Sequence, residues 1–387
     1  MLHEIMEKTV QFRRMSQLIG GLLAVLAPLA QAGPAARQSV GALATASDAI
    51  VAGSIEGSSA AGDINVTVRT ELVLKGPVRE GDILSLVWTP PYTSPPPAAW
   101  SATGHGLIFL DRTPSGGWTL NPVGQGDIAW QDTYFPTPAA GGAAPGGQGG
   151  ANFGDIRHNA EASLPANPSV LDRVLLELAV SVEARAPVPV DLVSEFRQSH
   201  SPVLTAAFGR YRSSQDPFLR GMGIRGALAA GDASGLQTVH QNYAALAAGK
   251  GWVPIVQEIK IYYSNAAPAA VQELGTIATD SNVGADLRVA AASALARMHT
   301  RQTLPFLGQL LGMDPISLRA AAVGGLSSFA NNVPVGLHEP ASGPWQYRTD
   351  DTISHSVFDN AAFASREAYY LEFWKSWWQQ NQGALMR

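Results

Sequence analysis

The stretch LRVAAASAL at residues 287–295 returns as LRAAAVGGL at residues 318–326, an offset of 31 residues. Self-similarity at such a period is typical of stacked helical hairpins, because one hairpin is too small to bury its apolar face alone. A weaker copy, LRGMGIRGAL, lies at 219–228, and the distance from Leu219 to Leu287 leaves room for one degenerate copy around 252–279. The sequence therefore predicts an α-helical repeat domain.

Helical periodicity begins after Pro168 and continues to the end of the chain. Between Val170 and Val182 apolar residues line one stripe with a period of 3.6 residues, and Pro168 and Ser169 are helix-start signals. Further helices are predicted at 191–198, 201–211, 217–230, 235–248, 253–264, 268–279, 285–299, 304–313 and 316–330. We assign this helical domain to residues 168–387.

The repeated phrase resembles HEAT repeats, over about residues 168–331. The residues that carry the resemblance are Leu287, Arg288, Ala291, Ala292, Leu295, Leu318, Arg319, Ala321, Ala322 and Leu326. It implies an α-solenoid with a concave face for peptides or proteins. The period of 31 to 34 is shorter than the roughly 40 to 47 of that family, so we expect an irregular, short solenoid. Structural roles are expected for the glycines and for the recurring arginines, which would bond neighbouring helix ends: Gly221, Gly226, Arg220, Arg288 and Arg319.

The half of the chain before the repeats has the two-residue period of β-strands. Strands are predicted at 49–55, 64–74, 83–88 and 106–110, separated by glycine-rich turns such as Glu80-Gly81-Asp82, and a short helix is predicted at 39–47. Short strands at this spacing indicate a small antiparallel barrel or sandwich. The predicted fold class is thus an α+β multidomain protein, with a β-barrel domain at 38–135 before the helical domain.

The strand region resembles exported bacterial domains of the OB or netrin-like barrel type. The resemblance is carried by Ser47–Gly53 (SDAIVAG), Val73–Gly76 (VLKG) and Gly106–Leu110 (GLIFL), the last of which would be a central strand buried on both faces. It implies a barrel fold and no particular activity, because such barrels carry many functions.

The first 32 residues have the order of a secretory signal peptide. Basic residues including Arg13 and Arg14 precede the short apolar run LIGGLLAVLA at 18–27, and Ala30-Gln31-Ala32 is a cleavage signal. We expect cleavage after Ala32 and a mature chain that is exported, periplasmic or extracellular. The alternative, an N-terminal membrane anchor, needs about 20 apolar residues, and no later stretch is long enough to be a transmembrane anchor in the mature chain.

Composition and charge narrow the class of protein. There is no cysteine, which excludes disulfides, thiolate metal sites and a cysteine nucleophile. The net charge is −5 without a basic run, so we expect no nucleic acid partner. Residues 136–167 begin with PTPAAGGAAPGGQGGANFG, a composition that predicts a flexible linker between the two domains.

Two groups of aromatic residues are candidates for an interaction surface. The first is the proline-rich loop at 89–100 (TPPYTSPPPAAW), with Trp88, Tyr92 and Trp100; the alternative is a rigid loop that packs back on the barrel. The second is the last helix, where aromatics recur every four residues: Tyr370, Trp374, Trp377 and Trp378. That helix either caps the last apolar face of the repeats or binds a partner.

Motifs of common hydrolases and zinc proteases are missing from the sequence, and we name no catalytic, cofactor-binding or metal-binding residue. The one constellation that could hold a divalent ion combines His338, Glu339, Asp350, Asp351 and His355, which are otherwise solvated loop residues. No cofactor is expected.

The sequence thus favours a non-catalytic protein-binding or scaffolding protein of the bacterial cell envelope, with an unknown protein partner. Two alternatives remain open: an envelope enzyme whose site lies unmarked at the interface between the domains, and a protease-inhibitor-like barrel. The second lacks the cysteine-tethered N-terminus that such inhibitors use.

Overall fold

A computed structural model describes residues 39–59, 64–88, 104–120, 134–136, 153–184, 191–249, 251–261, 267–332, 349–356 and 360–386. The chain forms two compact units, Met1–Ala139 and Ala140–Arg387. The first holds a small barrel and the second is helical, which confirms the predicted α+β multidomain class. The predicted signal peptide at 1–32 lies outside the described residues.

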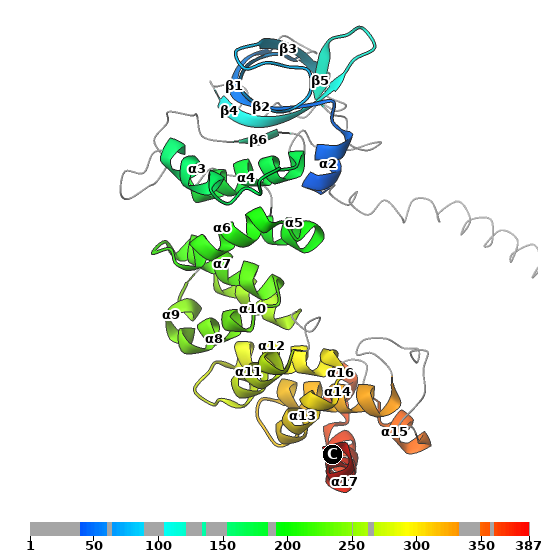
Figure 1. Ribbon diagram of the computed structural model, residues 1–387. Coiled ribbons are helices and arrows are strands. Elements are labelled where there is room, and N and C mark those ends of the chain that lie inside the picture. Colours follow the sequence, from blue (N-terminus) through cyan, green and yellow to red (C-terminus); the bar gives the residue numbers. More distant parts are fainter. Residues whose placement is uncertain are drawn as a thin grey trace, which may run out of the picture. The chain divides into compact units, whose positions relative to one another are not determined.

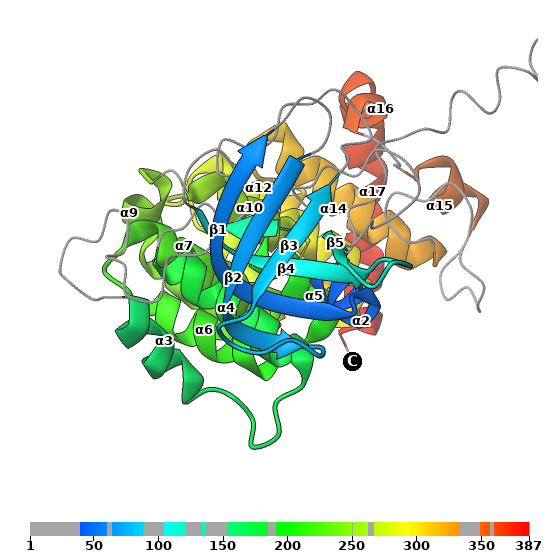
Figure 2. The same cartoon turned by 90° about the horizontal axis from the view of Figure 1, so that it is seen from above.

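Five strands of the first unit close into a β-barrel, whose ring is visible end-on in Figure 1 and whose strands cross in Figure 2. They are β1 (Ala49–Ser59), β2 (Ile64–Lys75), β3 (Ile83–Trp88), β4 (Gly104–Arg112) and β5 (Trp118–Leu120), and a short β6 (Tyr134–Pro136) pairs with β4. Their order is β1-β2-β3-β5-β4, and β4 pairs back to β1. The pair β3–β5 is parallel, which corrects the prediction of a wholly antiparallel barrel.

The barrel core comes from alternating residues of the paired strands. Its buried members are Ala49, Val51, Val68, Val78, Leu84, Leu86, Ile108 and Leu110. All four residues of the central β4 run, Leu107 to Leu110, are at most 1% exposed, so this strand is covered on both faces as its continuous apolar sequence predicts.

Helix α2 (Val40–Ala46) leads into the barrel. Ser39 caps it by accepting a hydrogen bond from the backbone N–H of Ala42, and Leu43 is buried. Its last turn is held by Lys75, whose Nζ donates to the carbonyls of Ala44 and Thr45 at 3.0 and 2.9 Å. A lysine at the carboxyl end of a helix satisfies carbonyls that have no partner within the helix.

Part of the predicted linker at 136–167 is helical. Helix α3 (Phe153–Glu161) packs against α4 (Val170–Glu183), with Ala160 buried in their shared cluster. Arg157 of α3 also donates to the buried Glu177 of α4 at 2.9 Å. The prediction of an unstructured linker is therefore wrong for 153–161, while residues 137–152 lie outside the described part of the chain.

The second unit continues with helices that follow the predicted order. They are α5 (Leu192–Ser199), α6 (Pro202–Arg212), α7 (Pro217–Ala229), α8 (Ala233–Gln241), α9 (Tyr243–Ala247), α10 (Trp252–Lys260), α11 (Pro268–Thr279), α12 (Ala285–Met298), α13 (Leu304–Leu310), α14 (Ile316–Asn331), α15 (Asp350–Ser354), α16 (Asn360–Ser365) and α17 (Glu367–Leu385). The predicted single helix at 235–248 is two helices that divide at Asn242, whose side-chain N–H₂ donates to the carbonyl of Thr238 at 2.9 Å.

Serine and aspartate side chains fix where α4 to α8 begin. The caps are Ser169, Asp191, Ser201, Asp216 and Asp232, and each accepts a hydrogen bond from a backbone N–H of the first turn. Such a cap satisfies a donor that the helix itself leaves without a partner, and its loss costs about 1 kcal/mol.

The helices stack in two layers, which Figure 1 shows as a succession from α4 to α14. In one layer α4 packs on α6, α8 on α11 and α11 on α13. In the other layer, here called the inner layer, α5 packs on α7, α7 on α10, α10 on α12 and α12 on α14. The inner helices α7, α10, α12 and α14 begin at residues 217, 252, 285 and 316, close to the repeat period of the sequence.

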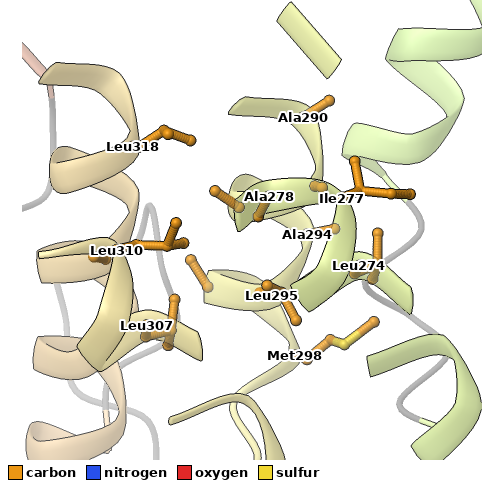
Figure 3. Packing of buried hydrophobic residues seen from close by; sticks show 14 of the residues in the cluster. Leu274, Ile277, Ala278, Ala290, Ala294, Leu295, Met298, Leu307, Leu310 and Leu318 are labelled. Carbon is orange, nitrogen blue, oxygen red and sulfur yellow. The ribbon is translucent and has the colours of Figure 1, made fainter. Parts of the chain in front are cut away.

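The repeated phrase occupies equivalent places in three inner helices. Its first leucine is the third residue of α7, α12 and α14, as Leu219, Leu287 and Leu318, and all three are buried. Leu295, the last residue of the first copy, is fully buried near Leu274 and Met298 (Figure 3). The phrase therefore marks the inner layer of a stack of helical hairpins, as its periodicity predicts.

One hairpin of the stack is open. Within each of the pairs α6/α7, α11/α12 and α13/α14 the two helices pack closely, but among the described residues α8 and α10 make no substantial contact with each other. The short α9 lies between them in the chain, and α10 packs on α7 and α12 instead. The predicted degenerate copy at 252–279 is thus divided, because α10 packs on α7 and α12 and does not form a hairpin with α11, which pairs with α12.

In the described residues, no helix is both long enough and apolar enough to cross a lipid bilayer.

Candidate binding cleft in the helical unit

A cleft of about 900 Å³ lies at the open hairpin. Its walls come from the end of α6, from α7, from α8 and α9, and from the start of α10. The residues that line it are Arg212, Pro217, Phe218, Arg220, Gly221, Met222, Ile224, Arg225, Thr238, Asn242, Ala245, Leu246, Ala248, Gly249, Gly251, Pro254 and Ile255. Its volume falls in the range of known ligand pockets, about 300 to 1,000 Å³.

The floor of the cleft is open because α7 carries a glycine where the other copies of the phrase carry a side chain. Gly221 corresponds to Val289 in α12 and Ala320 in α14. A Cβ built on Gly221 would meet only the Gly251 Cα and the Ile255 Cδ1, both at 4.0 Å. Space is therefore left between α7 and α10 that a larger residue would fill.

Two of the three arginines in the lining are anchored by carboxylates. Arg212 donates to the carboxylate of Asp232 at 3.2 Å and to the Ser234 hydroxyl at 2.8 Å. Arg225 donates through Nη2 to the Asp191 carboxylate at 2.9 Å, and its buried Nε has no hydrogen-bond partner and lies 3.7 Å from the Glu258 carboxylate. These ion pairs join the loop before α5 and the helices α6, α7, α8 and α10, and they hold the two guanidinium groups at the edge of the cleft.

Arg220 differs from its counterparts in the repeat. In α12, Arg288 donates to the carbonyl of Ala278 at the end of α11 at 3.2 Å, and in α14, Arg319 donates to the Met313 carbonyl just after α13 at 3.0 Å. These two bonds confirm the expectation that the recurring arginines join neighbouring helix ends. The expectation is wrong for Arg220, whose side chain is exposed and makes no hydrogen bond or ion pair with the part of the chain that the structure describes.

Apolar side chains line the same cleft as Arg220. Phe218, two residues before it, is 48% exposed although it is a large aromatic side chain, and Ile255 is buried at the base of the cleft. The start of α7 is fixed because Asp216 accepts from the backbone N–H of Phe218 at 2.9 Å. Within the described lining there is no aspartate, glutamate or histidine. The described lining of the cleft therefore combines an apolar surface with positive charge.

The predicted aromatic candidates of the last helix are in the core. Tyr370, Trp374 and Trp377 are at most 8% exposed and join the main apolar cluster, and Trp378 packs against it, close to Gly308 of α13. The burial of these three side chains favours the capping alternative, and the interaction surface stays a prediction. Trp88 ends β3 and nothing is described of its side chain, while Tyr92 and Trp100 lie outside the described residues.

The metal constellation is only partly described, because His338 and Glu339 lie outside the described residues. Asp350 and Asp351 are exposed in the first turn of α15. The His355 ring is stacked between Tyr369 and Phe373, with ring centres 4.2 and 3.9 Å away, and its Nδ1 lies 2.7 Å from the Asp351 carbonyl. No group of three or more metal-ligating side chains occurs among the described residues.

Two carboxylates outside the cleft, the buried Glu177 and the half-buried Asp111, have raised pKa values. Burial raises the pKa of Glu177 in α4 in spite of the adjacent Arg157, and burial raises the pKa of Asp111 in β4, whose Oδ1 has no hydrogen-bond partner in the described structure. Glu177 has a structural partner, and Asp111 belongs to the barrel unit. Neither carboxylate lines the cleft.

His240 links α8, a helix of the open hairpin, to α11. Its Nδ1 lies 2.8 Å from the Glu273 carboxylate and its Nε2 lies 3.1 Å from the Asp280 carboxylate, both at or just after α11. Burial lowers the pKa of His240, but the hydrogen bonds to the two carboxylates outweigh burial and raise the pKa above its ordinary value. When the ring is protonated, it joins α8 to α11 by two ion pairs.

We expect this link to weaken at high pH. Because the pKa of His240 is higher in the folded chain than in the unfolded chain, its stabilising effect is complete below the unfolded value of about 6.5 and is lost as the pH rises through the folded value. Denaturant unfolding of the wild type and of His240→Gln should therefore differ more at pH ~5.5 than at pH ~8.5. An equal difference at both pH values would contradict the ion-pair assignment.

The chain matches no protein-family model, no curated protein and no solved structure.

Proposed function

We propose that this protein is an exported, non-catalytic scaffold of the bacterial cell envelope, and that it binds a partner protein at the open hairpin of its helical unit. The observation that carries the proposal is the interruption of the stack. Hairpins on both sides are closed, whereas α8 and α10 stand apart and a cleft with exposed apolar groups lies at this place. Helical solenoids commonly use such surfaces for peptides and proteins.

In this proposal the helical unit is a solenoid of HEAT type. The support is the repeat step of the inner helices, the buried leucine at the third position of α7, α12 and α14, and the bonds that Arg288 and Arg319 make to neighbouring helix ends. The barrel is of OB type, supported by its five closed strands, its non-sequential strand order and its buried central strand.

A binding role is favoured over a catalytic role by the chemistry of the cleft. General acid–base catalysis needs a carboxylate, histidine or similar group within hydrogen-bond reach of the substrate. The described lining supplies arginines, one threonine, one asparagine and apolar groups. Arginine stays protonated in proteins and therefore serves to bind and orient an anion rather than to exchange a proton.

Export is part of the proposal and rests on residues 1–32. The apolar run at 18–27 and the Ala30-Gln31-Ala32 signal are those of a cleaved leader.

Site-specific crosslinking in the envelope fraction tests this function. A photoreactive benzoylphenylalanine at Phe218, which is 48% exposed, should give a defined adduct with a second protein, because it lies in the cleft wall. The same group at Ile83, 58% exposed on the barrel, is the control and should give no such adduct. Mass spectrometry of the purified band should find an N-terminus at Gly33. Adducts of equal yield at both positions, or none at Phe218, would refute the assignment of the cleft.

A further inference from the structure

One of the arginines that line the cleft has no carboxylate partner in the described structure. Three arginines line it, and no carboxylate does among the described residues. Arg212 is paired with Asp232, and Arg225 is paired with Asp191 and lies near Glu258. Those carboxylates compensate two of the three charges from outside the lining. The side chain of Arg220 has no such partner in the described structure. Its positive charge is therefore the one that a bound anion would meet.

Comparison of the copies of the phrase indicates that Arg220 does not bond the end of the preceding helix, as Arg288 and Arg319 do. Arg288 and Arg319 each bond a carbonyl at the end of the preceding helix. The corresponding carbonyls at the end of α6, those of Arg210 and Tyr211, instead accept from the backbone N–H groups of Ser213 and Ser214. The α6–α7 turn is thus closed by its own backbone, and the guanidinium of Arg220 is available to a ligand.

The surroundings of Arg220 decide which anion fits best. An exposed ion pair in water contributes little, about 0 to 1 kcal/mol, so charge alone would not bind a ligand there. Phe218, Ile255 and Leu246 line the same cleft, so an apolar ligand segment bound on them would displace water there and strengthen a carboxylate–guanidinium pair. The net charge of the whole chain is −5, which opposes a polyanion but tolerates a single carboxylate next to apolar groups.

We infer that the cleft binds an extended segment of a partner protein in which an aspartate or glutamate is flanked by apolar side chains, with Arg220 pairing the carboxylate. This inference rests on the proposed function and gives the chemical class of the segment. Gly221 contributes by leaving room for one apolar side chain between α7 and α10. The planar guanidinium of Arg220 suits bidentate pairing with a carboxylate.

Peptide selection tests the inference without knowledge of the natural partner. A phage library of random nonapeptides is selected against the full chain, and the most enriched sequence is synthesised with its acidic residue and with the matching amide. We expect the enriched peptides to carry Asp or Glu beside apolar residues. We expect the amide version, and Arg220→Glu against the acidic peptide, each to weaken binding about 10-fold or more. Arg220→Lys should retain more affinity than Arg220→Glu.

Two variants make the test specific. Arg173→Glu reverses an exposed arginine on α4 that lies outside the cleft lining, and it should leave peptide binding unchanged. Gly221→Leu fills the floor of the cleft and should weaken the binding of the acidic and the amide peptide to the same extent. Thermal melting checks that this variant folds.

Selection of neutral or basic peptides, failure to enrich any peptide, or equal effects of Arg173→Glu and Arg220→Glu would overturn the inference. Crosslinking at Phe218 that persists in the Arg220→Glu variant would leave the proposed function standing while the acidic-segment inference fails. If benzoylphenylalanine at position 218 gives no adduct in the chain that retains Arg220, the proposed function itself is refuted.

Discussion

Leu295→Ala is expected to lower the free energy of unfolding of the helical unit by about 2 to 5 kcal/mol, the usual cost of a cavity left by a buried leucine. Leu295 is fully buried in the main cluster of this unit, near Leu274 and Met298 (Figure 3). Urea unfolding followed by circular dichroism at the helical band measures the change. The barrel signal should keep its midpoint, because the cavity lies in the second unit.

A matched set of variants separates the repeat from general packing. Leu326→Ala removes the equivalent, fully buried residue of the second copy and should cost a similar amount. Arg288→Ala removes a side chain whose bond is to one carbonyl, at Ala278, and should cost about 1 kcal/mol. A silent Leu295→Ala, or one that shifts the barrel transition as much as the helical one, would show that the phrase does not mark a shared core.

The sequence predicts the inner layer well because the helices of that layer follow a local pattern of apolar residues. Among the inner helices, α12 and α14 differ from prediction by one residue at one end. In both inner helices the Leu-Arg start and the alanine-rich centre follow the helical period. A helix buried along most of its length has little freedom to depart from the period of its apolar residues.

Prediction fails where structure depends on contacts between distant parts of the chain. Strands β5 and β6 are three residues each, too short for a period, and are held by pairing with β3 and β4. Helix α3 begins in a glycine-rich segment but is held by packing on α4 and by the pair Arg157–Glu177. Neither kind of support is visible in a local window of sequence.

The cleft could not be predicted because it results from helices that fail to meet. Asn242 divides one predicted helix into α8 and α9, and α8 and α10 then have no substantial contact. The signals that could have located it are the glycine at Gly221 in place of Val289 or Ala320, and the weaker phrase around it. Arg220 follows the same sequence pattern as Arg288, yet only the structure shows that the Arg288 guanidinium bonds a carbonyl and that the Arg220 guanidinium has no partner among the described residues.

The second large effect on stability is expected for substitutions in the capping helix α17. Trp374 is completely buried, and its indole N–H donates to the carbonyl of His355 at 2.9 Å, which fixes the turn after α15. Its ring also meets Phe373 and Trp377 edge-on, each with ring centres 5.2 Å apart. We expect Trp374→Ala to cost about 3 to 5 kcal/mol, and Trp374→Phe to cost less because most of the buried area is kept while the hydrogen bond is lost.

The helices that lose protection in Trp374→Ala distinguish a capping role of α17 from a role in partner binding. Contacts in a solenoid are between neighbours, and α17 packs on α13, α14 and α16, so removal of Trp374 should expose the last repeat first. Hydrogen exchange in Trp374→Ala should accelerate in α13 and α14 while α4 and α6 keep their protection; Lys375→Ala, at an exposed position on the same helix, should change neither. Equal acceleration along all helices would mean that the unit unfolds as one cooperative block. Unchanged exchange, combined with lost binding of the peptides selected at the cleft, would instead assign the aromatic helix to partner recognition.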